Sequence, residues 1–394
     1  MRAHSYALYL GRVILVSSLL VAANSAWIQV THQTNGLGAI GATCQSQPDG
    51  ISCLIRNIIS DGPADHAGLR VGDVLLQLGN TADGPIADQI AKTKPGTHTS
   101  IQFQRGSGRK EAPIVVEDKL SLYLAAAAHR DHAAETVLGE MYVWGDGVPK
   151  DVKEGMAWLN KAAAGDPAAE VDLGSIYLNG EGIPRDDATA VSWFRKAAER
   201  GDPNGEYSLA YMYAEGRGIA KDPNPAFEWY RKAAVQGHAS SQWSLGWFYE
   251  QGFVVEKNVQ TAAMWYRKAA EQGLPEAEAH LGSMYFDGIG VPKDDTLALK
   301  WFRKAADKDQ AEAELGLGVM YAYGRGVPKN DATALAWYRK AAAQNDPAAE
   351  YFIGGMYESG TAVPKDINTA IDWYKKSAAH GYHDAATKLQ QLRP

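Results

Sequence analysis

Hydrophobic and polar positions follow a repeating pattern over most of the chain. A Leu or Ile recurs every 36 residues, at Leu173, Leu209, Leu245, Leu281, Leu317 and Ile353. A Trp keeps the same step, at Trp193, Trp229, Trp265, Trp301, Trp337 and Trp373. An earlier copy, with Leu138 and Trp158, lies 35 residues before its successor. A fixed period of this length is typical of a solenoid, so seven stacked copies are predicted between Leu138 and Gly381.

The copy that begins near Leu281 shows what each unit forms. Leu281 and Met284 stand at i and i+3, the spacing of one face of a helix. Gly288 follows as a helix stop, because glycine tolerates the left-handed conformation. The stretch TLALKWFRKAA then has helical spacing again, and Asp294 or Asp295 can cap it. Each unit is therefore predicted to be a helical hairpin that buries its apolar side chains by stacking on its neighbours.

The pattern LG-xx-Y-xx-G-x-GVP-x-D…A-xx-W-xx-KAA resembles the Sel-one-like repeat (SLR) family, a relative of the tetratricopeptide repeat. The resemblance implies an all-α solenoid of helical hairpins, wound as a right-handed superhelix, over residues 119–394. Residues 119–132 look like an incomplete first unit, and residues 384–392 look like a C-terminal capping helix. Three copies depart locally from the pattern, at Ala210, at Phe253-Val254-Val255 and at Thr361-Ala362.

Residues 27–118 lack the 36-residue step and follow a different pattern. Alternation from Thr99 to Arg105 predicts a strand, and a short helix fits Ile86 to Thr93. The stretch SDGPADHAGLRVGDVLLQLGN, from Ser60 to Asn80, is similar to the core of PDZ domains of the kind attached to bacterial periplasmic proteases. The resemblance implies a small, mainly β domain that binds the C-terminal end of a peptide.

The PDZ resemblance also implies where that peptide would bind. In the family, backbone amides of a loop receive the terminal carboxylate, and the peptide adds a strand to the sheet edge. That loop and the start of the strand correspond to Gly38, Ala39, Ile40, Gly41, Ala42 and Thr43. Ile86 and Ile90, at i and i+4, would form the apolar wall of the groove. Alternatively, the groove is closed and the domain only caps the solenoid.

The N-terminus indicates export. Arg2 and Arg12 precede an apolar run from Val13 to Ala23, and small residues follow it. A signal peptide is therefore expected over residues 1–26, which would place the mature chain in the periplasm or outside the cell. The alternative is an uncleaved anchor in the inner membrane, with the chain facing the periplasm.

Cys44 and Cys53 flank the turn sequence Gln47-Pro48-Asp49-Gly50. Two strands joined by this turn could place the sulfurs across from each other, and an oxidising compartment permits a disulfide. Two free thiols buried in adjacent strands are the alternative, because the sequence does not decide the geometry.

Composition and motifs narrow the classes of function. A net charge of −7 and a pI near 5.8 provide no basic footprint for nucleic acid. The G-x-G-x-x-G from Gly36 to Gly41 is not followed by a helical pattern, which dinucleotide binding requires. The histidine pairs His129/His132 and His380/His383 lack an evident third metal ligand. No catalytic site, metal or cofactor is therefore expected.

Side chains that the repeat does not dictate are candidates for binding a partner. On the first helix of each copy, residues two before and two after the Leu lie opposite the core face. In the third and fourth copies these are Tyr207, Tyr211, Trp243 and Trp247; Trp144, Tyr323 and, more weakly, Phe253 would extend the set. They predict an aromatic patch on the concave face of the solenoid; alternatively, they pack between helices. The methionines of the first helices, at Met141, Met212, Met284, Met320 and Met356, are predicted to be core.

Two interaction modules on one chain predict a non-catalytic periplasmic adaptor. Its PDZ groove would hold a C-terminal peptide, and the repeats would hold a second, envelope protein. The alternatives are a regulatory subunit or inhibitor of an envelope enzyme, such as a protease or a cell-wall hydrolase, and a hydrolase in its own right.

Overall fold

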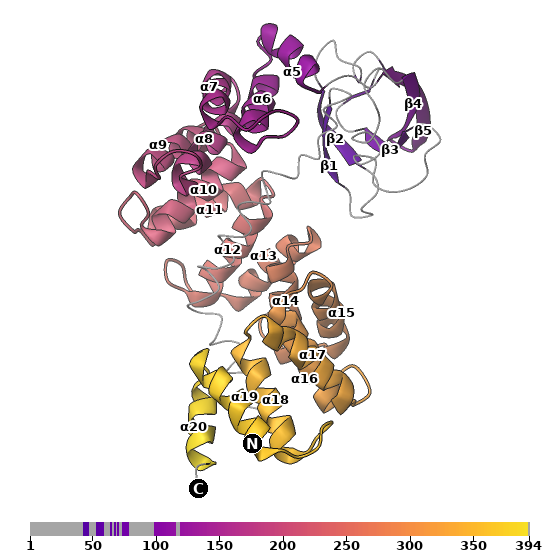
Figure 1. Ribbon diagram of the computed structural model, residues 1–394, viewed down its shortest axis with the longest axis vertical. Helices are drawn as coiled ribbons and strands as arrows, with labels where there is room; N and C mark the ends of the chain where they lie inside the picture. The colour runs from indigo at the N-terminus through magenta and orange to yellow at the C-terminus, as the bar shows by residue number, and fades with distance from the viewer. Residues whose placement is uncertain are drawn as a thin grey trace. The chain divides into compact units, whose positions relative to one another are not determined.

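The computed structural model describes residues 42–46, 53–58, 64, 67, 69–70, 73–78, 98–115 and 119–392. Two compact units divide the described chain, one ending at Lys221 and the other beginning at Asp222. The first unit contains a β-sheet and helices, and the second contains helices alone (Figure 1). The expected order, a mainly β domain before an all-α array, is confirmed.

Five antiparallel strands form one sheet, in the order β1-β2-β3-β4-β5 (Figure 1). They are β1 (Ala42–Ser46), β2 (Cys53–Ile58), β3 (Val74–Leu78), β4 (His98–Arg105) and β5 (Gly108–Val115). Ile101 and Phe103 of β4 are buried, as the alternation predicts, because they share one face of the pleated strand. Gly106 supplies the left-handed residue, at φ +60°, with which β4 turns into β5.

One ion pair, between buried Asp73 and half-buried Arg105, links the approach to β3 with the end of β4. Asp73 accepts hydrogen bonds from Nε and Nη2 of Arg105, at 2.7 and 2.6 Å, and from the backbone amide of Arg70 at 2.8 Å. Burial alone would raise the pKa of Asp73, but these three donors outweigh burial and lower it. The carboxylate therefore stays charged and holds the sheet together.

Helices make up the rest of the described chain (Figure 1). In the first unit they are α5 (Lys119–Ala128), α6 (His132–Trp144), α7 (Val152–Ala162), α8 (Pro167–Asn179), α9 (Asp187–Glu199) and α10 (Pro203–Glu215). In the second they are α11 (Pro223–Val235), α12 (Ala239–Gln251), α13 (Val259–Glu271), α14 (Pro275–Asp287), α15 (Asp295–Ala306), α16 (Ala311–Tyr323), α17 (Asp331–Ala343), α18 (Pro347–Ser359), α19 (Ile367–Ala379) and α20 (His383–Gln391). None of these described helices combines the length and the apolar character needed to cross a bilayer.

The helices pack as hairpins that stack on one another. In the first unit α6 packs on α7 and α8 on α9; in the second, α12 packs on α13, α14 on α15, α16 on α17 and α18 on α19. First helices of successive hairpins also meet, α6 with α8, α8 with α10, and α14 with α16. Stacking therefore buries the sides that one hairpin leaves open.

The glycine after the repeat Leu lets the two helices of a hairpin approach. A Cβ at Gly282 would lie 2.7 Å from the ring of Phe302, and one at Gly318 would lie 2.4 Å from the ring of Tyr338. Both rings are buried. The aromatic residue that follows the repeat Trp thus fills the space that the missing side chain leaves.

Caps and loop glycines occupy their predicted places. Gly288 ends α14 in the left-handed conformation, and the side chain of Asp294 accepts hydrogen bonds from the first free amides of α15. Gly290 lies at φ +70°, and a Cβ there would be 2.2 Å from the carbonyl oxygen of Val259, at the start of α13. The second loop glycine therefore allows the loop to touch the preceding hairpin.

The core and the Trp row differ in exposure. The predicted methionine core is confirmed, because Met141, Met212, Met284, Met320 and Met356 are all buried. The repeat Trp is half-buried in all copies except Trp301, which is buried. In every copy the ammonium group of the Lys three residues later lies over the indole ring, from 3.7 Å at Trp193 to 4.9 Å at Trp158. The Lys stem and charge thus cover the ring through a cation–π contact.

Candidate functional site

Strand β1 is the edge at which a peptide would join the sheet. Within the described residues, β1 hydrogen-bonds to β2 and to no other strand. Ala42 and Thr43 begin β1, and the register shifts between Thr43 and Cys44. Gly38, Ala39, Ile40, Gly41, Ile86 and Ile90 lie outside the described residues. The carboxylate loop and the groove wall therefore stay predictions.

The two cysteines belong to adjacent antiparallel strands but are not direct partners. Cys44 pairs with Ile55 across the ladder, and Cys53 pairs with Ser46. Each cysteine is thus displaced from the other along the strands, and the disulfide stays a prediction.

An aromatic pair marks the fourth repeat. The ring of Trp247, on α12, lies 5.6 Å from the ring of Phe253 and packs edge-on against Phe248 at 5.3 Å. Phe253 is 67% exposed and belongs to the loop that departs from the repeat pattern. We call Trp247 and Phe253 the aromatic pair. The two rings form an apolar surface, and packing against Phe248 holds the orientation of the Trp247 ring.

Trp243 lies on the same helix as Trp247 and packs against the core. It is half-buried and packs against the ring of Tyr266, at 6.4 Å between centroids. Its indole Nε1 is buried and has no hydrogen-bond partner among the described residues. A hydrogen-bond acceptor of a bound molecule could pair with this N–H group. The indole ring itself packs against neighbouring side chains.

The other predicted aromatics differ in exposure. Tyr211 of α10 is only 7% exposed, unlike its expected place on an open face, and Tyr207 is half-buried. The reason is that first helices pack against each other, as α8 does against α10, so positions opposite the hairpin core still lie at a contact. Tyr323 is 61% and Trp144 37% exposed. Tyr207 and Tyr211 belong to the first compact unit, and Trp243 and Trp247 to the second.

A row of buried polar side chains is not part of the Leu, Gly and Trp pattern of the repeat. It stands three residues before each repeat Leu and consists of Glu135, Glu170, Glu206, Gln242, Glu278, Glu314 and Glu350, all buried. Its partners lie thirty residues later, at the end of the same repeat: Arg200 for Glu170, Gln272 for Gln242, Lys308 for Glu278, Gln344 for Glu314 and His380 for Glu350. The row keeps the 36-residue step, so the sequence did contain its signal.

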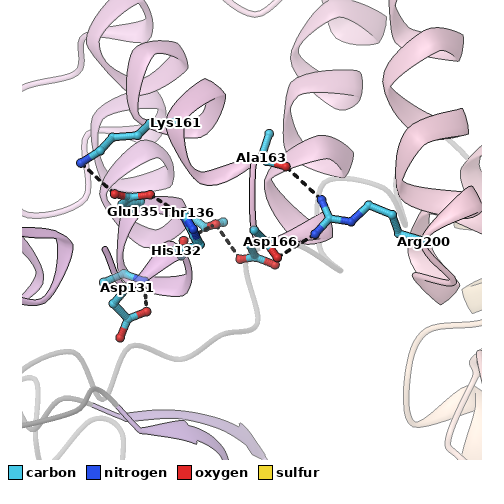
Figure 2. Close-up of polar contacts among 10 residues, drawn as sticks. Asp131, His132, Glu135, Thr136, Lys161, Ala163, Asp166 and Arg200 are labelled. Atoms are coloured by element: carbon cyan, nitrogen blue, oxygen red, sulfur yellow. Dashed lines mark hydrogen bonds and ion pairs between the residues drawn. The ribbon is translucent and has the colours of Figure 1, made fainter. Parts of the chain in front are cut away.

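In the first repeat the buried glutamate has partners at other positions, because this repeat is one residue shorter than the others. Glu135 pairs with Lys161 at 2.7 Å and with His132 at 2.8 Å (Figure 2). Figure 2 also shows that Thr136 donates to Asp166, the N-cap residue of α8, at 2.6 Å. These contacts hold hairpins together and give His132 a structural role. No group of three or more His, Cys, Asp or Glu side chains suited to a metal occurs in the described part of the chain.

Two acidic side chains meet between α6 and α8. Burial raises the pKa of Glu140 well above its usual range, and the charge of Asp172 adds to this. Burial and the charge of Asp166 raise the pKa of Asp172 to about 7. The repeat demands neither residue, since the other copies carry Ser, Tyr, Trp, Val or Gly in place of Glu140 and Val, Ser, His, Gly or Phe in place of Asp172. Perturbed carboxyl groups of this kind also occur in structural clusters, and these two lie where α6 and α8 pack together.

The segments that match a known family have the same boundaries as the hairpins. Seven consecutive segments match the Sel1 repeat: residues 132–166, 167–202, 203–238, 239–274, 275–310, 311–346 and 347–382. The chain belongs to the Sel1 repeat family. The seven predicted copies are thereby confirmed, and residues 38–116 match the PDZ domain.

Solved structures place this Sel1 repeat protein among bacterial relatives. A protective antigen of uropathogenic Escherichia coli strains, which displays an SLR fold, is 38% identical with a TM-score of 0.61. The match covers 70% of this chain and 59% of the antigen, so the chain spans little more than half of that protein. A Sel1 repeat protein from Oxalobacter formigenes is 34% identical with a TM-score of 0.52, over 70% of this chain and 80% of the relative. No curated protein matches the chain.

Sel1 repeats and PDZ domains are both modules that bind proteins, and both families are generally non-catalytic. Their combination indicates a protein-interaction scaffold.

Proposed function

We propose that this Sel1 repeat protein is a non-catalytic adaptor of the bacterial envelope. Its PDZ domain binds the C-terminal end of one protein at the edge of β1, and its repeats bind a second protein. The observation that carries the proposal is the aromatic pair, Trp247 and Phe253, because it combines exposure with a local departure from the repeat.

The fourth loop exposes side chains at the surface instead of packing closely against the preceding hairpin. The loops of the fifth and sixth repeats keep a glycine at Gly290 and Gly326, where a Cβ would meet the preceding hairpin. The fourth loop has Val254 there, after Phe253. Phe253 contacts Trp247 but leaves most of its ring exposed, and exposed rings of this kind are enriched among the anchors of protein interfaces.

Two binding modules on one chain raise the effective concentration of their ligands for each other. The proposal therefore needs both sites to work in the same molecule. The export signal expected over residues 1–26 supports a periplasmic location, with an inner-membrane anchor as the alternative. Regulation of an envelope protease or cell-wall hydrolase would be one use of such an adaptor.

The test is affinity capture from a periplasmic extract with the full chain and with two kinds of variant. One carries Trp247→Ala and Phe253→Ala; the other lacks residues 38–42. Each should lose a different set of partners, and Ile289→Ala, at the exposed position of the fifth loop that corresponds to Phe253, should lose neither. Circular dichroism checks that each variant remains folded.

Retention of every partner by both variants would refute the adaptor. If a captured partner is an envelope hydrolase, its turnover with and without this chain separates regulation from passive tethering. Turnover by the chain alone, on esters, β-lactams or peptides, would contradict the absence of catalysis.

A further inference from the structure

His280 joins the fourth and fifth repeats through a half-buried carboxylate. It lies on α14 with 11% of its side chain exposed, and its Nε2 is 3.1 Å from Oε2 of Glu250 at the end of α12. The hydroxyl of Tyr266, on α13, donates to the same oxygen at 2.8 Å. The ring of Tyr266 also lies 4.5 Å from the imidazole. Three helices thus meet at one carboxylate.

The repeat does not require a histidine at this place. The position just before the repeat Leu is held elsewhere by Val137, Asp172, Ser208, Ser244, Gly316 and Phe352. Packing of the hairpin therefore tolerates side chains of every kind there. A buried ionisable group at such a position needs a reason other than the fold.

The seventh repeat and the terminal helix α20 together form a matching triad with a different cation. Three periods further along the chain, Glu358 accepts a hydrogen bond from Tyr374 at 2.7 Å and pairs with Lys388 at 2.9 Å. Lys388 stands where His280 stands, at the same position of the repeat register. A lysine stays charged throughout the physiological pH range, whereas a histidine titrates within it. The chain therefore holds one triad able to titrate near neutral pH and one that is not.

Several charged groups face His280 from the helices around it. Burial lowers the pKa of His280, but the hydrogen bond and charge of Glu250 and the charge of Glu312, on α16, outweigh burial and raise it. Burial raises the pKa of Glu312, which also accepts a hydrogen bond from Ser283 at 2.9 Å. Burial favours protonation of Glu250, yet His280, Tyr266 and Lys257 together lower its pKa.

We propose that His280 is a pH-sensitive clamp, which holds the fourth and fifth repeats together while its imidazole is protonated and loosens them as the pH rises. The positive charge of a protonated imidazole neutralises the charge of Glu250 and partly offsets that of Glu312. Loss of the imidazole proton leaves these two half-buried carboxylates without their cation, which is costly.

The direction of the effect follows from linkage. A histidine with a raised folded-state pKa contributes stability that is fully present below its unfolded value, about 6.5, and is lost as the pH passes the folded value. Trp247 and Glu250 share α12, so loosening there would also change how the aromatic pair is presented. That consequence for binding rests on the proposed function, whereas the clamp itself does not.

Hydrogen exchange of the full chain, read by mass spectrometry at about pH 6 and pH 8.5, measures the clamp without any partner. After correction for intrinsic exchange, peptides from α12 to α14 should lose protection at the higher pH. The loss should approach tenfold for each unit by which the pKa is raised. The His280→Lys variant, which copies the seventh repeat, should abolish this loss.

The reciprocal variant, Lys388→His, should add a pH-dependent loss of protection in α18 to α20 beyond that of the wild type. Asp346, whose pKa is raised by burial, also responds to pH, but it is present in all variants and its effect cancels in the difference. Because Lys388 lies on the terminal helix, this variant keeps the test decisive if His280→Lys fails to fold. Equal pH responses of wild type and variants would overturn the clamp.

Discussion

The fourth and fifth repeats share one hairpin plan but use it differently. In the fifth, every residue from Ala277 to Phe286 on the first helix is buried, and Gly290 lets the loop rest on the preceding hairpin. In the fourth, Val254 replaces the loop glycine, and Phe253 lies exposed against Trp247. The difference teaches that a copy obeying the pattern uses its side chains for stacking. A copy that departs from it leaves some of them exposed.

The largest expected difference in unfolding free energy is between substitution of buried Phe302 in the fifth repeat and substitution of exposed Phe253 in the fourth. Phe302→Ala should lower the free energy of unfolding by about 3–5 kcal/mol, because the ring fills the space beside Gly282 and Gly316 of two first helices. Phe253→Ala should change it by no more than about 0.5 kcal/mol. Urea denaturation followed by circular dichroism measures both. Similar losses would mean that Phe253 belongs to the core after all.

The loop glycine should have the next largest effect. Gly290→Ala places a methyl group in the left-handed region and against the Val259 carbonyl, at an expected cost of roughly 1–3 kcal/mol. Gly237→Ala is the matched control, because Gly237 also has a positive φ but nothing lies within 4 Å of its Cβ position. The difference between their unfolding free energies isolates the loop contact. No difference would show that the loop moves aside freely.

The smallest effect concerns the buried polar row. Lys308→Gln removes the charge opposite Glu278, which lies 2.8 Å away, and should cost about 1 kcal/mol at low salt and less at high salt. The fourth repeat has the neutral pair Gln242 and Gln272 at the same place, 2.8 Å apart. Gln272→Ala should therefore show no salt dependence in its unfolding free energy. A salt effect of equal size in both variants would argue against a specific ion pair.

Most of the repeat fold could be predicted, because its determinants are local. The Leu281 and Met284 spacing, the stop at Gly288 and the cap at Asp294 each act within a few residues of their own helix. The strand through Ile101 and Phe103 was predictable for the same reason. The candidate site was harder. The sequence singled out Trp247 and Phe253, but it could not separate them from Tyr211, which occupies the same repeat position as Trp247 and is buried.

The sequence by itself determined the period, the two-helix unit and the order of the two kinds of domain. Repetition multiplies a weak local preference seven times, and caps and glycines act through the backbone of their own turn. Only the tertiary structure decided which unconstrained side chains reach solvent and which partners lie thirty residues away. It alone showed Glu250, Tyr266 and His280 converging, because contacts of that kind depend on how one hairpin sits on the next.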